Sequence, residues 1–138
     1  MEAINELTMF SIFKSKPDSA QPLIAVVSGK QVHLRKLNSK SAIKTYSYGG
    51  ANGYPISCQV SPDNVHVVAV TDNGHICISK TSSSGIFCTF GGNKCSTFGA
   101  GAIPTRASWI DNENLLVGTN KGRSFQFNIK TRKTKDVR

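Results

Sequence analysis

The chain has 138 residues, a formal net charge of +9 and 12 glycines, and 38% of its residues are hydrophobic. This composition predicts one turn-rich globular domain. It excludes a membrane-spanning helix, because no apolar run approaches the roughly 18 residues that such a helix needs. Glu2 and Glu6 stand where a secretory signal has a basic start, so we expect an intracellular, cytoplasmic protein without membrane insertion.

Residues 1–13 fit two local structures. Alternate apolar residues between Leu7 and Phe13 fit a strand, whereas Ala3, Leu7 and Phe10 fit one turn of a helix. The β-forming side chains of this segment favour the strand, and the helix stays open as the alternative.

Residues 65–90 contain three short apolar runs rich in Val, Ile, Phe and Cys. Asp72-Asn73-Gly74 separates the first two runs, and a Ser- and Gly-rich stretch separates the second from the third. Asn-Gly between two β-rich runs is a strong hairpin signal, because both residues tolerate the positive φ of a tight turn. The segment is therefore predicted to be a three-stranded meander.

Two strands of this region carry further information. The run from Val65 to Val70 is apolar on both faces, which is typical of a strand packed between neighbouring sheets. Before it, residues 55–61 predict an inner strand with Ile56, Cys58 and Val60 on one face.

The meander recurs in residues 22–48 and 114–137, each with a glycine turn after its first apolar strand. The equivalent strands begin at Leu23, Val67 and Leu115, which lie 44 and then 48 residues apart. A period in the forties with four strands per unit is typical of propeller blades. The single domain, 1–138, then divides into units of about 1–49, 50–101 and 102–138, with a basic C-terminal tail at about 130–138.

Two of these units resemble blades of the WD-repeat family. The resemblance rests on Val60-Ser61-Pro62-Asp63, Asp72-Asn73-Gly74, Ile76 and Ile78 in one unit, and on Asn120-Lys121-Gly122 in the next. No Gly-His pair precedes a blade and no Trp-Asp pair ends a third strand. Of the polar tetrad that stiffens family blades, only Asp72 is at its position. The resemblance implies an all-β fold of three propeller-type blades, each a four-stranded antiparallel sheet.

Three blades are fewer than the four to eight of closed propellers. Two chains related by a two-fold axis would give a six-bladed ring, so we expect a homodimer. A different partner chain, or a longer propeller of which this is a part, is the alternative.

The sequence contains no recognisable catalytic or metal-binding motif, and we expect no cofactor. Cys58, Cys77 and Cys88 fall within strands and are expected to be part-buried small hydrophobes, with a disulfide or a zinc site that includes His75 as the alternative. Cys95 lies in the longest loop, residues 91–104, and is the best candidate for an exposed thiol. An enzyme with its site at the propeller axis remains possible, because such sites leave no local motif.

The surface charge and the loops indicate binding. In the blade arrangement, the glycine turns and the connections between blades share one face. That face is the candidate site for a protein or peptide partner, with Lys30, Tyr48, Tyr54, Lys94, Phe98, Arg106, Lys121 and Arg123. For Tyr48 the favoured alternative is that its ring simply packs the end of its blade. The basic C-terminal segment favours polyanions and makes nucleic-acid binding the alternative, through Lys130, Arg132, Lys133, Lys135 and Arg138.

Overall fold

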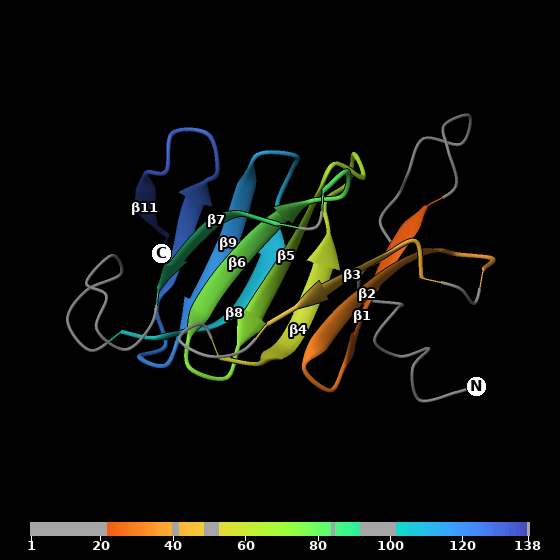
Figure 1. Ribbon diagram of the computed structural model, residues 1–138. Coiled ribbons are helices and arrows are strands. Elements are labelled where there is room, and N and C mark those ends of the chain that lie inside the picture. Colours follow the sequence, from red (N-terminus) through yellow and green to blue (C-terminus); the bar gives the residue numbers. More distant parts are fainter. Residues whose placement is uncertain (1–21, 40–41, 49–52, 84, 92–101, 138) are drawn as a thin grey trace.

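The computed structural model describes residues 22–39, 42–48, 53–83, 85–91 and 102–137. These residues form eleven strands and no helix (Figure 1). In chain order the strands are β1 (Leu23–Ser28), β2 (Gln31–Lys36), β3 (Lys44–Ser47), β4 (Pro55–Val60), β5 (His66–Thr71), β6 (His75–Lys80), β7 (Ile86–Gly91), β8 (Pro104–Trp109), β9 (Asn114–Thr119), β10 (Ser124–Asn128) and β11 (Thr134–Val137).

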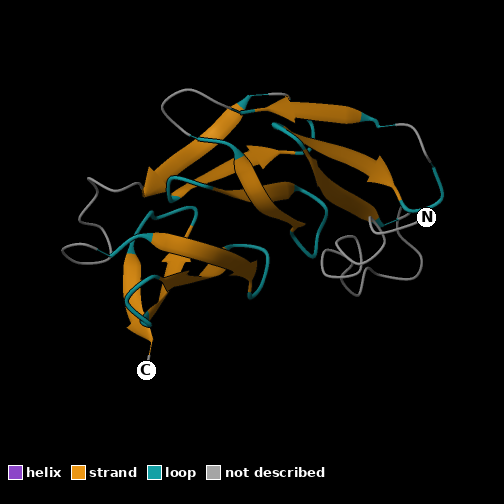
Figure 2. Ribbon diagram, turned by 90° about the horizontal axis from the view of Figure 1, so that it is seen from below, coloured by secondary structure: helices purple, strands orange, loops and turns teal. Residues whose placement is uncertain are grey.

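The strands form three antiparallel meanders that follow one another in space. The first sheet has the order β1-β2-β3, the second β4-β5-β6-β7 and the third β8-β9-β10-β11. Strand β4 contacts β1 on one side and β8 on the other, so the first strands of the three sheets are neighbours (Figures 1 and 2). The second and third sheets have the predicted four strands, and the first has three within the described part of the chain. Residues 1–13 lie outside the described residues.

The glycine turns occur where the repeat predicts them. Gly29, Gly74 and Gly122 have φ of 61°, 83° and 76° and join β1 to β2, β5 to β6 and β9 to β10. Gly74 is constrained twice. Its backbone is left-handed, and an added Cβ would lie 2.2 Å from Cγ2 of Ile103, which leads into the third sheet.

Strand β5 is buried on both faces, as predicted. Val67 and Ala69 pack with the first sheet, whereas Val68 and Val70 pack with the third. The predicted apolar strand, Val65 to Val70, began one residue too early, because Val65 lies in the turn before β5 and is exposed.

Strand β4 differs from its predicted alternation. A β-bulge shifts its register on β5 between Pro55 and Ser57, and Ile56 within the bulge is 54% exposed. The bulge breaks the period of two, so Ile56 does not share a buried face with Cys58 and Val60.

The third sheet is apolar on one face only. Leu115, Val117, Phe125 and Phe127 point toward the second sheet, where Phe127 stacks on Phe90 with ring centroids 3.9 Å apart. Residues directly opposite in antiparallel strands share a face, so the pairing registers define two rows on the other side. These rows are Ser108-Leu116-Gln126-Lys135 and Arg106-Gly118-Ser124-Val137. We call this the outward face, and it is mostly polar.

The C-terminal segment is more ordered than the predicted basic tail. Asn128 accepts hydrogen bonds from the backbone N–H groups of Lys130 and Thr131, both at 2.9 Å, and Arg132 follows in a left-handed conformation with φ of 62°. This turn sends the chain back along β10, where β11 adds the fourth strand.

Val68→Asp should abolish cooperative folding. The new carboxylate would lie unpaired in the core between the second and third sheets, at a cost of about 3–5 kcal/mol. Leu116→Asp is the matched control, because Leu116 lies on the outward face and is 37% exposed. Thermal unfolding followed by circular dichroism should show loss of the transition for Val68→Asp alone. A cooperative transition for Val68→Asp at the wild-type temperature would refute the burial of β5 on both faces.

Candidate functional site

The loop face consists of the β1–β2, β5–β6 and β9–β10 turns and the ends of the connections that enter β4 and β8. Asp72 of the β5–β6 turn accepts a hydrogen bond from the Tyr54 N–H at 2.9 Å, and the Asp72 N–H donates to the Tyr54 carbonyl at 2.8 Å. Asn120 holds Ile103 in the same way, at 2.7 and 2.9 Å. One turn side chain therefore fixes each connection beside the turn of its own sheet.

Two of the predicted binding residues meet on the loop face. The Lys30 ammonium lies over the Tyr54 ring, 5.1 Å from its centroid, and joins the first turn to the connection that enters the second sheet. Such a contact stabilises by about 0.5–1 kcal/mol at an exposed site. The Tyr54 side chain is still 41% exposed, so it remains accessible to a partner.

Tyr48 is placed differently from the prediction. Its side chain is buried in the core between the first and second sheets, and its hydroxyl faces that of Ser79. Burial raises the pKa of Tyr48 far above its usual value. Tyr48 therefore packs the end of its sheet and does not present its ring to a partner.

Of the remaining predicted members of this face, Arg106 lies exposed on the outward face of β8, and the others fall into three groups. Lys121 is exposed in the β9–β10 turn. Arg123 forms an ion pair with Asp136 and lies over the Phe125 ring, 5.4 Å from its centroid, so its charge is largely compensated. Lys94 and Phe98 lie outside the described residues.

The predicted polyanion-binding residues do not form one patch with the loop face. Lys130, Arg132 and Lys133 lie in the β10–β11 turn, at the opposite end of β10 from Lys121. Lys135 lies on the outward face, midway along β11. Arg138 lies outside the described residues.

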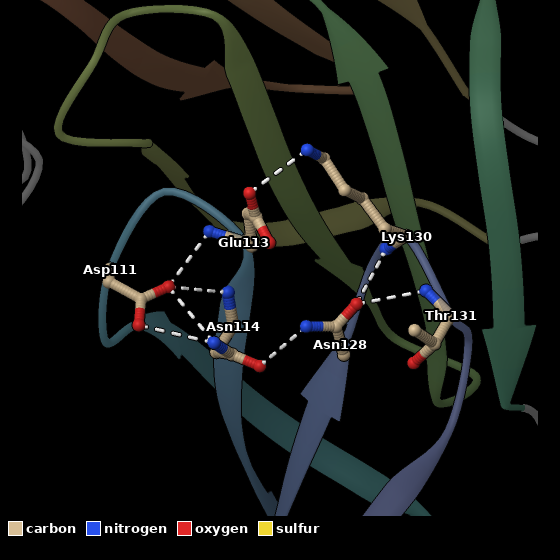
Figure 3. Close-up of polar contacts among 6 residues, drawn as sticks. All are labelled: Asp111, Glu113, Asn114, Asn128, Lys130 and Thr131. Atoms are coloured by element: carbon tan, nitrogen blue, oxygen red, sulfur yellow. Dashed lines mark hydrogen bonds and ion pairs between the residues drawn. The ribbon is translucent and has the colours of Figure 1, made fainter.

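A polar network holds the β10–β11 turn against the β8–β9 turn (Figure 3). The Asp111 carboxylate accepts the backbone N–H groups of Glu113 and Asn114 at 2.8 and 2.9 Å, and these bonds, that from Glu113 foremost, lower its pKa. Asn114 in turn accepts from the Asn128 side chain at 3.0 Å, and Lys130 pairs with Glu113 at 3.0 Å. Asp111 and Glu113 thus have structural roles in these turns, and one cation of the basic segment, Lys130, is already paired.

A cavity of about 470 Å³ lies beside the first strands of the three sheets. We call it the first-strand cavity. Its lining comes from β1, β4 and β8 and consists of Ala25, Val27, Ser57, Cys58, Gln59, Arg106, Ala107 and Ser108. Trp109 of β8 holds β8 against β4. Its backbone N–H donates to Gln59 Oε1 and its indole N–H donates to the Gln59 carbonyl, both at 3.0 Å. No local pattern predicts this contact, because its two residues are fifty positions apart in the chain.

The polar groups of this cavity are hydroxyl, amide, thiol and guanidinium groups. Among its described lining residues there is no histidine or carboxylate. Burial raises the pKa of the Cys58 thiol to about 12, so this cysteine remains protonated and is a poor nucleophile near neutral pH. Within the described part of the chain, no group of three or more His, Cys, Asp or Glu residues is placed to hold a metal ion, and no helix is long and apolar enough to cross a membrane.

Asp72→Ala should destabilise the chain by about 1 kcal/mol, because the Tyr54 N–H loses its acceptor. Asp72→Asn should be nearly neutral, since Asn120 makes the same pair of bonds in the third sheet. Urea unfolding midpoints of the two variants provide the measurement. Equal midpoints for Ala and Asn at position 72 would show that this side chain does not hold the connection.

No protein-family model matches the chain, and no curated protein matches it in sequence. A chain in the crystal structure of the mitotic checkpoint complex superposes with a TM-score of 0.66 at 18% identity, over 87% of this chain and 34% of that one. The β-propeller domain of Cps50 (Swd1) from Myceliophteria thermophila gives a TM-score of 0.64 at 14% identity, over 84% and 38%. The present chain thus spans little more than a third of these structures. Its fold is that of a WD-repeat-like β-propeller, in three divergent blades with no Gly-His pair before a blade and no Trp-Asp pair at the end of a third strand.

Proposed function

We propose that the chain is a non-catalytic binding module that presents its loop face to a protein or peptide partner. The observation that carries this proposal is the pair formed by Lys30 and Tyr54, in which a cation lies over an aromatic ring that is still 41% exposed. Tyrosines of this kind are frequent anchors of interfaces, because they bury a large amphipathic area at a small entropic cost.

The backbone around Tyr54 is held before any partner arrives. Asp72 forms two hydrogen bonds with Tyr54, and an added Cβ on the preceding Gly53 would lie 2.6 Å from the Asp72 carboxylate. The backbone here therefore loses little conformational freedom when a partner binds, and the smaller entropic cost favours affinity. The same fold in a chain of the mitotic checkpoint complex supports a role in protein assembly.

The charges of the loop face favour an acidic partner. Lys30 and Lys121 are exposed in the turns of the first and third sheets, on either side of the second sheet, and Asp72 is occupied by its bond to Tyr54. Acidic side chains in a peptide would therefore be attracted to the two lysines while an apolar or aromatic residue packs on Tyr54.

Nucleic-acid binding by the C-terminal segment remains the alternative. It has less support from the geometry, because Arg123 and Lys130 are paired with Asp136 and Glu113, and the described cations lie at two ends of β10. A steep loss of affinity with added salt would be its signature.

The homodimer remains a prediction. A ring of two copies would pack the outward face of one chain on the first sheet of the other. The outward face presents Arg106, Ser108, Gln126 and Lys135 around a single central leucine, Leu116. Such a contact would bury polar and charged groups, so its interface would have to be hydrated or fully hydrogen-bonded.

Peptide selection tests the proposal. Random twelve-residue peptides displayed on phage should enrich for acidic sequences on the wild-type chain, and Tyr54→Ala should weaken their binding at least tenfold, as expected for an interface anchor. Lys30→Ala should weaken it less. Lys36→Ala is the matched control, because Lys36 is exposed at the far end of β2.

Fluorescence polarisation of the enriched peptides gives the affinities. Peptides that bind Tyr54→Ala as tightly as the wild type would show that the loop face is not the binding surface. The loop face would also be ruled out as the binding surface if the selection on the wild-type chain enriched no peptide beyond those enriched on an unrelated β-protein.

A further inference from the structure

The first-strand cavity has a composition suited to a particular ligand. Ala25 and Val27 of β1 and Ala107 of β8 provide apolar wall, whereas Ser57 and Ser108 provide hydroxyl groups. The volume of about 470 Å³ lies within the range of roughly 300–1,000 Å³ that is typical of small-molecule sites. A ligand that fits must therefore combine an apolar body with a polar group.

Among the described lining residues, Arg106 is the one that is charged at neutral pH, since Cys58 stays protonated. Its side chain lies over Gly118, where an added Cβ would be 3.0 Å from Arg106 Cγ. Because Gly118 has no side chain, the aliphatic part of Arg106 can pack directly on its backbone. No ion pair of Arg106 occurs within the described residues, in contrast to Arg123, which is held by Asp136.

The walls around Arg106 are held in place. Trp109, three residues further along β8, is 4% exposed and joins β8 to Gln59 of β4 through two hydrogen bonds of 3.0 Å. Gln59 lines the cavity itself. A ligand that enters between the strands thus meets a site that is already formed, which reduces the ordering cost of binding.

We propose that the first-strand cavity binds a carboxylate with a short apolar body. Its two oxygens would accept hydrogen bonds from the Arg106 guanidinium, whose fork matches a carboxylate, and its apolar part would lie against Val27, Ala25 and Ala107. This site is distinct from the loop-face anchor at Tyr54, so the inference goes beyond the proposed function. The carboxylate can belong to a free organic acid or to a side chain of a bound peptide.

Benzoate and benzamide form a matched pair of probes, because they share shape and differ in charge. Titration of the isotope-labelled chain, followed by amide NMR shifts, should show benzoate binding at least tenfold more tightly than benzamide. The shifts should centre on Ser57, Gln59, Arg106 and Ser108. The lone tryptophan, Trp109, adds a fluorescence readout beside the cavity.

Variants identify the group that binds. Arg106→Gln should weaken benzoate at least tenfold, and Arg106→Lys should have a smaller effect because it keeps the charge without the fork. Lys133 is exposed in the β10–β11 turn, so Lys133→Gln is the control for the loss of one positive charge elsewhere on the chain. This variant should bind benzoate as tightly as the wild type. Arg106 is exposed, so these variants are expected to fold, and their unfolding temperatures verify this.

Three results would overturn the inference: equal affinity for benzoate and benzamide, wild-type affinity in Arg106→Gln, or shifts centred on residues 129–135. Competition separates the two sources of carboxylate. Displacement of benzoate by the acidic peptides selected above assigns the site to a peptide side chain, and no displacement assigns it to a free acid. Tyr54→Ala should leave benzoate binding unchanged, so the failure of one proposal is distinguishable from the failure of the other.

Discussion

The central strand β5 of the second sheet is apolar on both faces, and neither face can be left exposed to water. The arrangement of the first and third sheets follows from this constraint. Val67 and Ala69 of β5 lie on one face and Val68 and Val70 on the other, and each is at most 1% exposed. Burial of a valine side chain is worth about 1.5–3 kcal/mol, which is lost on any face without a neighbour. The first sheet covers one face and the third covers the other, so the three meanders have to stack in chain order.

Stacking places the functional features at the two borders between sheets. At the loop end, the β5–β6 turn contacts both connections, through Asp72 to Tyr54 and through Gly74 to Ile103. At the inner edges, the first strands lie side by side and leave the cavity that contains Arg106. Both candidate sites are therefore built on rigid strands and their turns, and neither depends on a catalytic residue.

Local patterns were sufficient to predict the meanders and their glycine turns, but not the bulge in β4 or the extent of strand β11. Asn73-Gly74 and Lys121-Gly122 marked hairpins because only the sequence within a few residues determines a tight turn, and the apolar run of β5 indicated burial on both faces. Contacts between distant segments could not be read in this way. The burial of Tyr48 and the bonds of Trp109 to Gln59 depend on how sheets dock, and the pairing of Arg123 with Asp136 depends on the register of β11 on β10. The alternation of Phe125-Gln126-Phe127-Asn128 agrees with a sheet that has one polar face, whereas no local pattern marks the first-strand cavity.

Hydrogen exchange of individual backbone amides in the native chain tests the central claim that the second sheet is sealed on both faces. The amides of β5 and β6 should exchange only through global unfolding, with the free energy that urea denaturation gives. Those of the outermost strands β3 and β11 should exchange through smaller local openings. Exchange of β5 amides at a lower free energy than those of β10, whose sheet has one polar face, would contradict the account.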